Sequence, residues 1–84
     1  MQDDEIRELV LGRLGEVLGA EVNPGYGFVV QGGDSLMAII FSQSFEDSFG
    51  ITIPADELLQ SPSIESLVAK VCDGLDAKYP DSQI

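Results

Sequence analysis

Three stretches of this chain repeat their apolar residues with the spacing of an α-helix. In residues 3–18 the apolar positions follow one another in steps of three, one and four, which gathers them on one helical face. Residues 35–49 and 64–75 are also predicted to be helical from their apolar spacing. A short fourth helix follows Pro54, because proline favours the first helical turn, and ends near Gln60. The chain is therefore predicted to be all-α, a four-helix bundle of three main helices plus one short helix.

A long loop is predicted between the first two helices, over residues 20–33. Glycine and proline interrupt any regular structure there, at Asn23-Pro24-Gly25, Gly27 and Gly32-Gly33. We expect some of the apolar side chains of this loop to pin it onto the core, the candidates being Val22, Phe28 and Val29.

The second long helix is expected to bury a stripe of aromatic rings. Phe41, Phe45 and Phe49 recur at intervals of four, so they share one helical face. Met37 and Ile40 lie off that stripe and are predicted to be exposed. Capping residues mark the helix ends: Asp34 or Ser35 at the start, Gly50 at the end, and Ser63 before the last helix.

Length and composition indicate one cytoplasmic domain over residues 1–84. Eighty-four residues suffice for a single domain, and a hydrophobic content of 44% favours a folded core. No apolar run approaches the roughly 20 residues that span a bilayer, and the acidic N-terminus lacks the basic start of a signal peptide. The single cysteine, Cys72, excludes an internal disulfide and is expected to be a buried structural thiol.

The charge balance limits the classes of partner. Fifteen acidic residues face four basic ones, for a net charge of −11. Such a surface repels nucleic-acid backbones and anionic membranes, so we expect neither as a partner, and we expect a monomer. Residues 14–69 contain no cation, so the acidity favours solubility and could also steer the chain toward basic patches on partner enzymes. The absence of histidine removes the usual general base and the commonest metal ligand.

A serine at a helix start follows a pair of glycines in the sequence Gly32-Gly33-Asp34-Ser35-Leu36. The glycines permit positive φ angles and close backbone approach. A serine in this position faces solvent, and a helix N-terminus favours an attached anion such as a phosphodiester. The alternative is that Ser35 or Asp34 only caps the helix. The residues alone leave both interpretations open.

The order and spacing of further blocks extend this motif over most of the chain, from about Glu5 to Val71. They are Phe28 upstream of the motif, Phe49-Gly50-Ile51, Ile53-Pro54 with Asp56, Glu57, Leu58 and Leu59, and Ser61-Pro62-Ser63-Ile64-Glu65-Ser66-Leu67. In these blocks the sequence resembles the phosphopantetheine-binding carrier family, and most closely a free-standing peptidyl carrier protein.

The resemblance implies a chain without catalytic activity that carries 4′-phosphopantetheine covalently on Ser35. A Mg²⁺-dependent phosphopantetheinyl transferase would attach the arm, and Asp34 would help to bind the Mg²⁺ or cap the helix. An adenylation or acyl-loading enzyme and downstream condensing or tailoring enzymes would be the further partners. The second helix is the family's main docking surface, so Leu36, Met37 and Ile40 become candidate partner contacts.

The branch of the family stays open. The double glycine is similar to peptidyl carriers of non-ribosomal peptide or related natural-product biosynthesis, whereas the acidity is more like acyl carriers of polyketide or fatty-acid synthesis. Gln31 and Gly27 depart from the peptidyl pattern, which usually has an apolar and a polar residue there. Met1 and the short flanks are typical of a discrete protein, and an excised domain is the alternative.

Parts of the sequence also suggest two other functions. Gly-Asp-Ser-Leu is also a nucleophile motif of serine esterases, but without histidine or a sheet this chain cannot complete such a site. A carrier-like interaction domain that is never modified is the second alternative, and the intact Asp34-Ser35-Leu36 argues against it.

Overall fold

Four α-helices make up the regular structure of residues 3–78, the part of the chain that the computed structural model describes. They are α1 (Asp3–Leu18), α2 (Ser35–Phe49), α3 (Ala55–Gln60) and α4 (Ile64–Lys78). No strand occurs in this part of the chain. The predicted all-α fold with three main helices and one short helix is confirmed. Residues 1–2 and 79–84, the ends of the predicted domain, lie outside the described residues.

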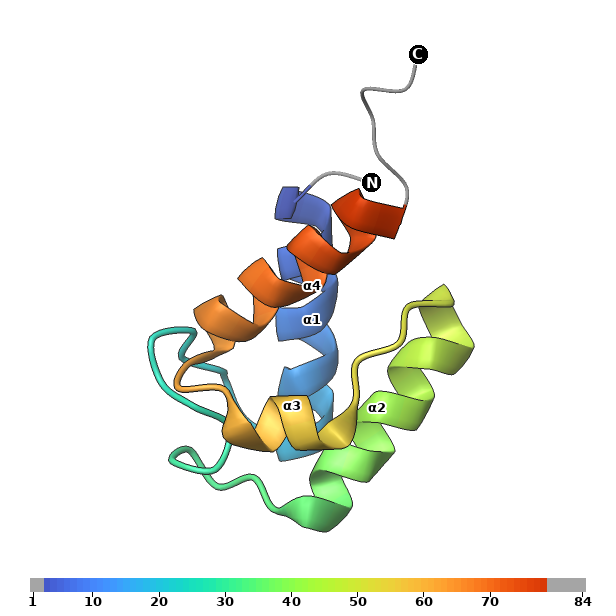
Figure 1. Ribbon diagram of the computed structural model, residues 1–84. Coiled ribbons are helices and arrows are strands. Elements are labelled where there is room, and N and C mark those ends of the chain that lie inside the picture. Colours follow the sequence, from blue (N-terminus) through green and yellow to red (C-terminus); the bar gives the residue numbers. More distant parts are fainter. Residues whose placement is uncertain (1–2, 79–84) are drawn as a thin grey trace.

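The helices pack so that α1 contacts both α2 and α4, while α3 connects α2 to α4. Figure 1 shows α3 lying across the end of the bundle at which α2 begins. The long loop between α1 and α2 lies at the same end of the bundle, beside the start of α4. The N-terminus of α2 and the long loop are therefore held by elements from the whole chain.

The core is mostly aliphatic, with three phenylalanine rings at its centre. Its largest fully buried side chains are Phe28, Phe41, Phe45, Ile6, Leu14, Ile53, Leu58, Ile64, Leu67 and Val10. Phe28 thus pins the loop as expected, whereas Val22 is only partly buried and Val29 is exposed. Cys72 is buried in this core, which agrees with the predicted structural thiol.

The aromatic stripe of α2 is less deeply buried at its end than the sequence pattern predicts. Phe41 and Phe45 are fully buried with ring centroids 5.2 Å apart, but Phe49 is only partly buried. Phe49 is the last residue of α2. The guanidinium of Arg13 covers its ring at 5.5 Å from the centroid, a cation–π contact that the sequence did not reveal.

The helix ends use the capping residues that the sequence predicts. Gly50 ends α2 with φ at 68°, in the left-handed region that favours glycine. The Ser63 hydroxyl accepts the backbone N–H of Ser66 at 3.1 Å at the start of α4. No helix within residues 3–78 combines the length and apolar character that crossing a bilayer requires.

Candidate functional site

The first residue of α2, Ser35, is exposed, and the preceding residue performs the capping. Asp34 has extended backbone, with φ at −136°, and its carboxylate accepts the backbone N–H of Met37 at 2.9 Å. Of the two capping candidates in the sequence, the structure therefore selects Asp34. The hydroxyl of Ser35 is not needed to cap the helix and stands at its N-terminus, where the first amide groups have no partner within the helix.

The other serines in the described residues differ from Ser35 because their hydroxyl groups take part in hydrogen bonds. Three donate to main-chain carbonyl groups, one accepts from Arg13, and two form the cap of α4. They are, in that order, Ser42, Ser44 and Ser61, then Ser48, then Ser63 and Ser66. Esterification of any of these would remove or disturb a structural bond. Among the described serines, Ser35 is the one whose hydroxyl makes no such bond.

The two glycines before Asp34 serve different purposes. Gly32 has φ at 105°, a conformation that residues with a side chain rarely adopt. Gly33 has no positive φ, but it is buried against Phe28, and a Cβ atom there would overlap the Phe28 ring. The Gly33 N–H also donates to the Phe28 carbonyl at 3.0 Å. The chain can therefore turn tightly over a buried ring and deliver Ser35 to the surface.

The side chain of Gln31 cross-links the loop through hydrogen bonds to its main chain. Its amide oxygen accepts the backbone N–H of Asn23 at 2.9 Å, and its amide nitrogen donates to the carbonyl of Asn23 at 2.9 Å. The same nitrogen lies 3.3 Å from the Tyr26 carbonyl and 3.2 Å from that of Gly27. An apolar residue cannot make these bonds. Gln31, which the sequence marked only as a departure from the peptidyl carrier pattern, thus orders the loop before Ser35.

The loop is also bound to α4. The carbonyl of Tyr26 accepts the N–H of Ile64 at 2.9 Å, and that of Pro24 accepts the N–H of Glu65 at 3.0 Å. These are first-turn amides of α4, which no helical carbonyl can satisfy. A Cβ atom on Gly27 would lie 3.2 Å from the Ser61 carbonyl oxygen, so the second departure from the peptidyl pattern also fits a close contact.

The predicted contact residues form an exposed apolar strip beside Ser35. Leu36 is 66% exposed and Ile40 is 48% exposed, while Met37 is partly buried. Exposure of Met37 is thus only partly as predicted, because its side chain also packs against the core. Met37 and Ile40 are three residues apart and Leu36 and Ile40 four, and all three line the surface of α2 beside α1.

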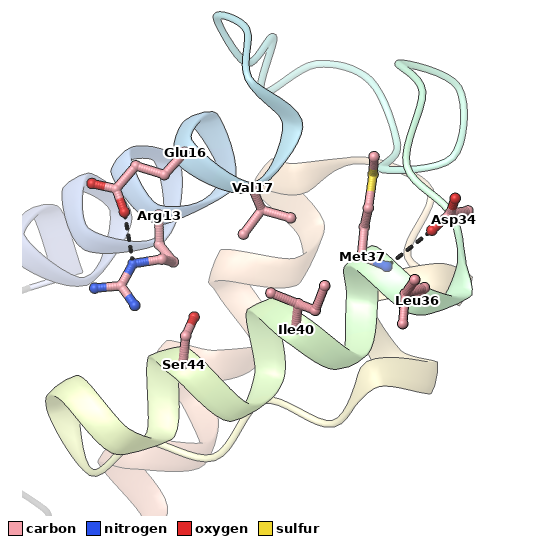
Figure 2. Close-up of a pocket in the computed structure, with 8 residues that line it drawn as sticks. All are labelled: Arg13, Glu16, Val17, Asp34, Leu36, Met37, Ile40 and Ser44. Carbon is pink, nitrogen blue, oxygen red and sulfur yellow. Dashed lines mark hydrogen bonds and ion pairs between the residues drawn. The ribbon is translucent and has the colours of Figure 1, made fainter.

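This strip is one wall of an open hollow of about 530 Å³ between α1 and α2. Figure 2 shows Val17 of α1 pointing toward Ile40 of α2, with Arg13 and Glu16 at the far end from Asp34. The full set of lining residues is Arg13, Glu16, Val17, Asp34, Leu36, Met37, Ile40 and Ser44. The sequence pattern did not predict that residues of α1 take part in this site. The four-residue spacing of Arg13 and Val17 predicts that they share one face of α1, but it does not predict that this face lies opposite α2.

Cations of the bundle are paired with carboxylates, while other acidic side chains stay exposed. Arg13 is neutralised by Glu16, with Nε and Oε1 3.2 Å apart, and Lys70 lies 3.9 Å from Glu57. Asp34 and Asp56 are exposed. The exposed Asp34 carboxylate lies directly beside Ser35, which favours a basic docking surface on the partner.

A comparison with known protein families identifies this arrangement. The model of the phosphopantetheine attachment site matches residues 4–71, which include α1, the long loop, the Ser35 motif, α2, α3 and the first half of α4. A search of curated proteins gave no match. The chain therefore belongs to the phosphopantetheine-binding family, whose members carry 4′-phosphopantetheine covalently on a serine.

Proposed function

We propose that the 84-residue chain acts as a single carrier domain and that Ser35 is its attachment residue. The proposal rests on one observation. Asp34 caps α2, so the exposed Ser35 hydroxyl remains available to an incoming enzyme. A phosphodiester at this point would lie at the positive end of the α2 dipole, where negative charge is stabilised.

In this proposal a phosphopantetheinyl transferase joins Ser35 to coenzyme A. The Ser35 oxygen forms a bond to the phosphorus that bears the pantetheine, adenosine 3′,5′-bisphosphate leaves, and the hydroxyl proton passes to the transferase or water. When bound, the arm supplies a terminal thiol that holds an acyl or aminoacyl group as a thioester. The carrier supplies a rigid body and an exposed attachment point, and carrier domains of this family are generally not catalytic themselves.

The partners of the loaded protein would be an adenylation or acyl-loading enzyme, followed by condensing or tailoring enzymes. We favour aminoacyl cargo in non-ribosomal peptide or related biosynthesis, because the Gly32-Gly33 pair is similar to that of peptidyl carriers. The net charge of −11 supports the alternative, an acyl carrier of polyketide or fatty-acid type. Leu36, Met37 and Ile40 are the proposed partner contacts, since they are apolar, adjacent to Ser35 and accessible from solvent.

Intact-protein mass spectrometry after incubation with coenzyme A, Mg²⁺ and a broad-specificity transferase tests the assignment. The wild-type protein should gain one phosphopantetheine group, and Ser35→Ala should gain none while its circular dichroism is unchanged. Ser48→Ala is the matched control, because Ser48 is also an exposed serine of α2, and it should be modified like the wild type. A folded wild-type protein that never gains mass would favour the unmodified interaction domain.

A further inference from the structure

We propose that Gln31 is a positioning residue for the modification of Ser35. The proposal rests on the function proposed above, since it concerns the same reaction. The side-chain amide of Gln31 holds the long loop in the conformation that a transferase binds. It acts through the main chain that leads to Ser35 and not by contact with the reacting hydroxyl.

The Gln31 side chain joins the two halves of the long loop. Its amide oxygen accepts the N–H of Asn23, and its amide nitrogen lies within hydrogen-bonding distance of the carbonyl groups of Asn23, Tyr26 and Gly27. A carboxamide offers one acceptor oxygen and two N–H donors, so one side chain serves main-chain groups at three positions. These contacts fix the turn at residues 23–27 relative to residue 31.

The turn that Gln31 contacts is itself bound to α4. The Tyr26 carbonyl accepts the N–H of Ile64 at 2.9 Å and also lies 3.3 Å from the amide nitrogen of Gln31. A carbonyl oxygen has two lone pairs and can accept both bonds. In the same turn, the Pro24 carbonyl accepts the N–H of Glu65 at 3.0 Å. The Gln31 side chain therefore connects the segment before Ser35 to the first turn of α4.

The main chain between Gln31 and Ser35 is short and contains two glycines. Glycine loses more conformational freedom on folding than any other residue, so an ordered path through Gly32 and Gly33 needs support on both sides. After the glycines, Asp34 is fixed to α2 by its cap. Before them, the Gln31 amide fixes the main chain to the rest of the loop. Loss of that amide should loosen one end of the segment and leave the other end in place.

A positioning role makes a specific kinetic prediction. When the loop of a variant samples several conformations, only a fraction of the folded molecules can bind the transferase, and the apparent affinity falls by that fraction. Every molecule that has bound carries the competent loop, so the maximal rate does not change. The KM for the carrier should therefore rise while kcat stays constant.

Steady-state kinetics with a broad-specificity transferase measures this split, with the full chain as the varied substrate and with coenzyme A and Mg²⁺ saturating. Gln31→Leu removes the donors and the acceptor, and we expect its KM to rise by about tenfold, the order expected for the loss of one or two hydrogen bonds. Gln31→Glu keeps the shape and the acceptor but places a carboxylate against three carbonyl groups. Its KM should rise at least as much, and kcat should stay at the wild-type value in both variants.

Val10→Ala separates positioning from a loss of overall stability. Val10 is fully buried in α1 and does not belong to the loop. Its truncation lowers the free energy of unfolding by leaving a cavity in the core. We expect the midpoint of urea unfolding to fall in this variant while its KM stays at the wild-type value. An equal rise of KM in Val10→Ala and Gln31→Leu would assign the effect to stability and overturn the proposal.

Amide hydrogen exchange followed by nuclear magnetic resonance gives a readout that does not depend on the transferase. In the wild type the N–H groups of Asn23 and Gly33 are hydrogen-bonded and should be protected. In Gln31→Leu both should exchange faster, while the amides in the middle of α1 keep their protection. The Gly33 amide is the informative one, because it bonds to the Phe28 carbonyl and not to the Gln31 side chain.

The outcomes distinguish this proposal from the carrier function itself. Wild-type KM in folded Gln31→Leu and Gln31→Glu, with Gly33 protection retained, would overturn the positioning role and leave the carrier function intact. A fall in kcat at unchanged KM would also overturn it. A wild-type protein that is never modified at Ser35 would overturn both.

Discussion

The absence of a side chain at Gly33 allows the loop to close over the core. Its backbone lies against the Phe28 ring, both residues are buried, and the next residues deliver Ser35 to the surface. Since Gly33 has no positive φ, the requirement for glycine here is one of space alone.

We predict that Gly33→Ala lowers the free energy of unfolding by about 1–3 kcal/mol, the usual cost of forcing extra volume into a packed core. Gly12→Ala is the control, because Gly12 lies in α1 with open space where the Cβ would go, and it should stabilise the protein by about 0.5–1 kcal/mol. Urea unfolding followed by circular dichroism measures both. Equal effects of the two substitutions would show that the Phe28 contact is not limiting.

At the scale of a secondary-structure element, α2 begins with a cap that is also part of the modification motif. The Asp34 carboxylate accepts the Met37 N–H and could, in addition, help the transferase to bind Mg²⁺. Substitution of Asp34 should therefore affect both the stability of α2 and the rate of modification, for two different reasons.

The variants Asp34→Asn and Asp34→Ala separate these two roles. Asparagine caps helices as well as aspartate, so Asp34→Asn should keep its stability, whereas Asp34→Ala should lose about 1 kcal/mol. If the carboxylate contributes to Mg²⁺ binding, both variants should be modified more slowly than the wild type, and the Mg²⁺ concentration for half-maximal rate should rise. Modification of Asp34→Asn at the wild-type rate would leave capping as the sole role.

The packing of α1 against α4 includes an ion pair. Arg7 donates from Nε and Nη2 to the two carboxylate oxygens of Glu65, at 3.2 and 2.9 Å. These hydrogen bonds lower the pKa of Glu65 and raise the pKa of Arg7. Because the pKa of Glu65 is lower in the folded state than in the unfolded chain, its stabilising contribution is complete above the ordinary value of 4.5. It is lost as the pH falls through the lowered value.

We therefore expect the stability difference between the wild type and Glu65→Gln to be largest at neutral pH and to shrink in acid. Both partners are exposed, so the difference at neutral pH should be small and should fall with added salt. Urea unfolding at a series of pH values measures it. In an Arg7→Leu background the same substitution should show no such pH dependence, and a difference that grows toward low pH would contradict the ion pair's role.

At the scale of the whole molecule, the net charge of −11 creates a field that acts before any contact forms. Attraction to a basic partner surface raises the association rate and is screened by salt, because the Debye length falls from about 10 Å at 0.1 M to about 3 Å at 1 M. Acidic residues lie at both ends of the bundle. The effect of where a charge lies can therefore be tested separately from the effect of the net charge.

The second-order rate of Ser35 modification should fall as NaCl is raised from 0.05 to about 0.5 M, a range in which screening becomes strong. Asp56→Asn and Asp3→Asn remove the same charge from opposite ends of the bundle: Asp56 is on α3, at the end where α2 begins, and Asp3 starts α1 (Figure 1). We expect Asp56→Asn to slow modification more. Equal effects would show that only the net charge matters.

Local rules were sufficient to predict the four helices and most of their ends, although α4 runs to Lys78, beyond the predicted 64–75. Apolar spacing depends only on the 3.6-residue period, and caps such as Gly50 and Ser63 act within one turn, so both can be read along the chain. The exposed serine motif could also be predicted for the same reason. Burial on α2 was misjudged at Phe49 and in part at Met37, because burial depends on how the helices pack.

The sequence by itself determined the four helices, the acidic surface and the serine at the head of α2, because these follow from neighbouring residues and from composition. Only the tertiary structure decided that Gln31 closes the loop, that Phe28 lies against Gly33, and that Arg13 and Val17 face α2. Such contacts join residues far apart in the chain, and their geometry exists only once the helices have packed.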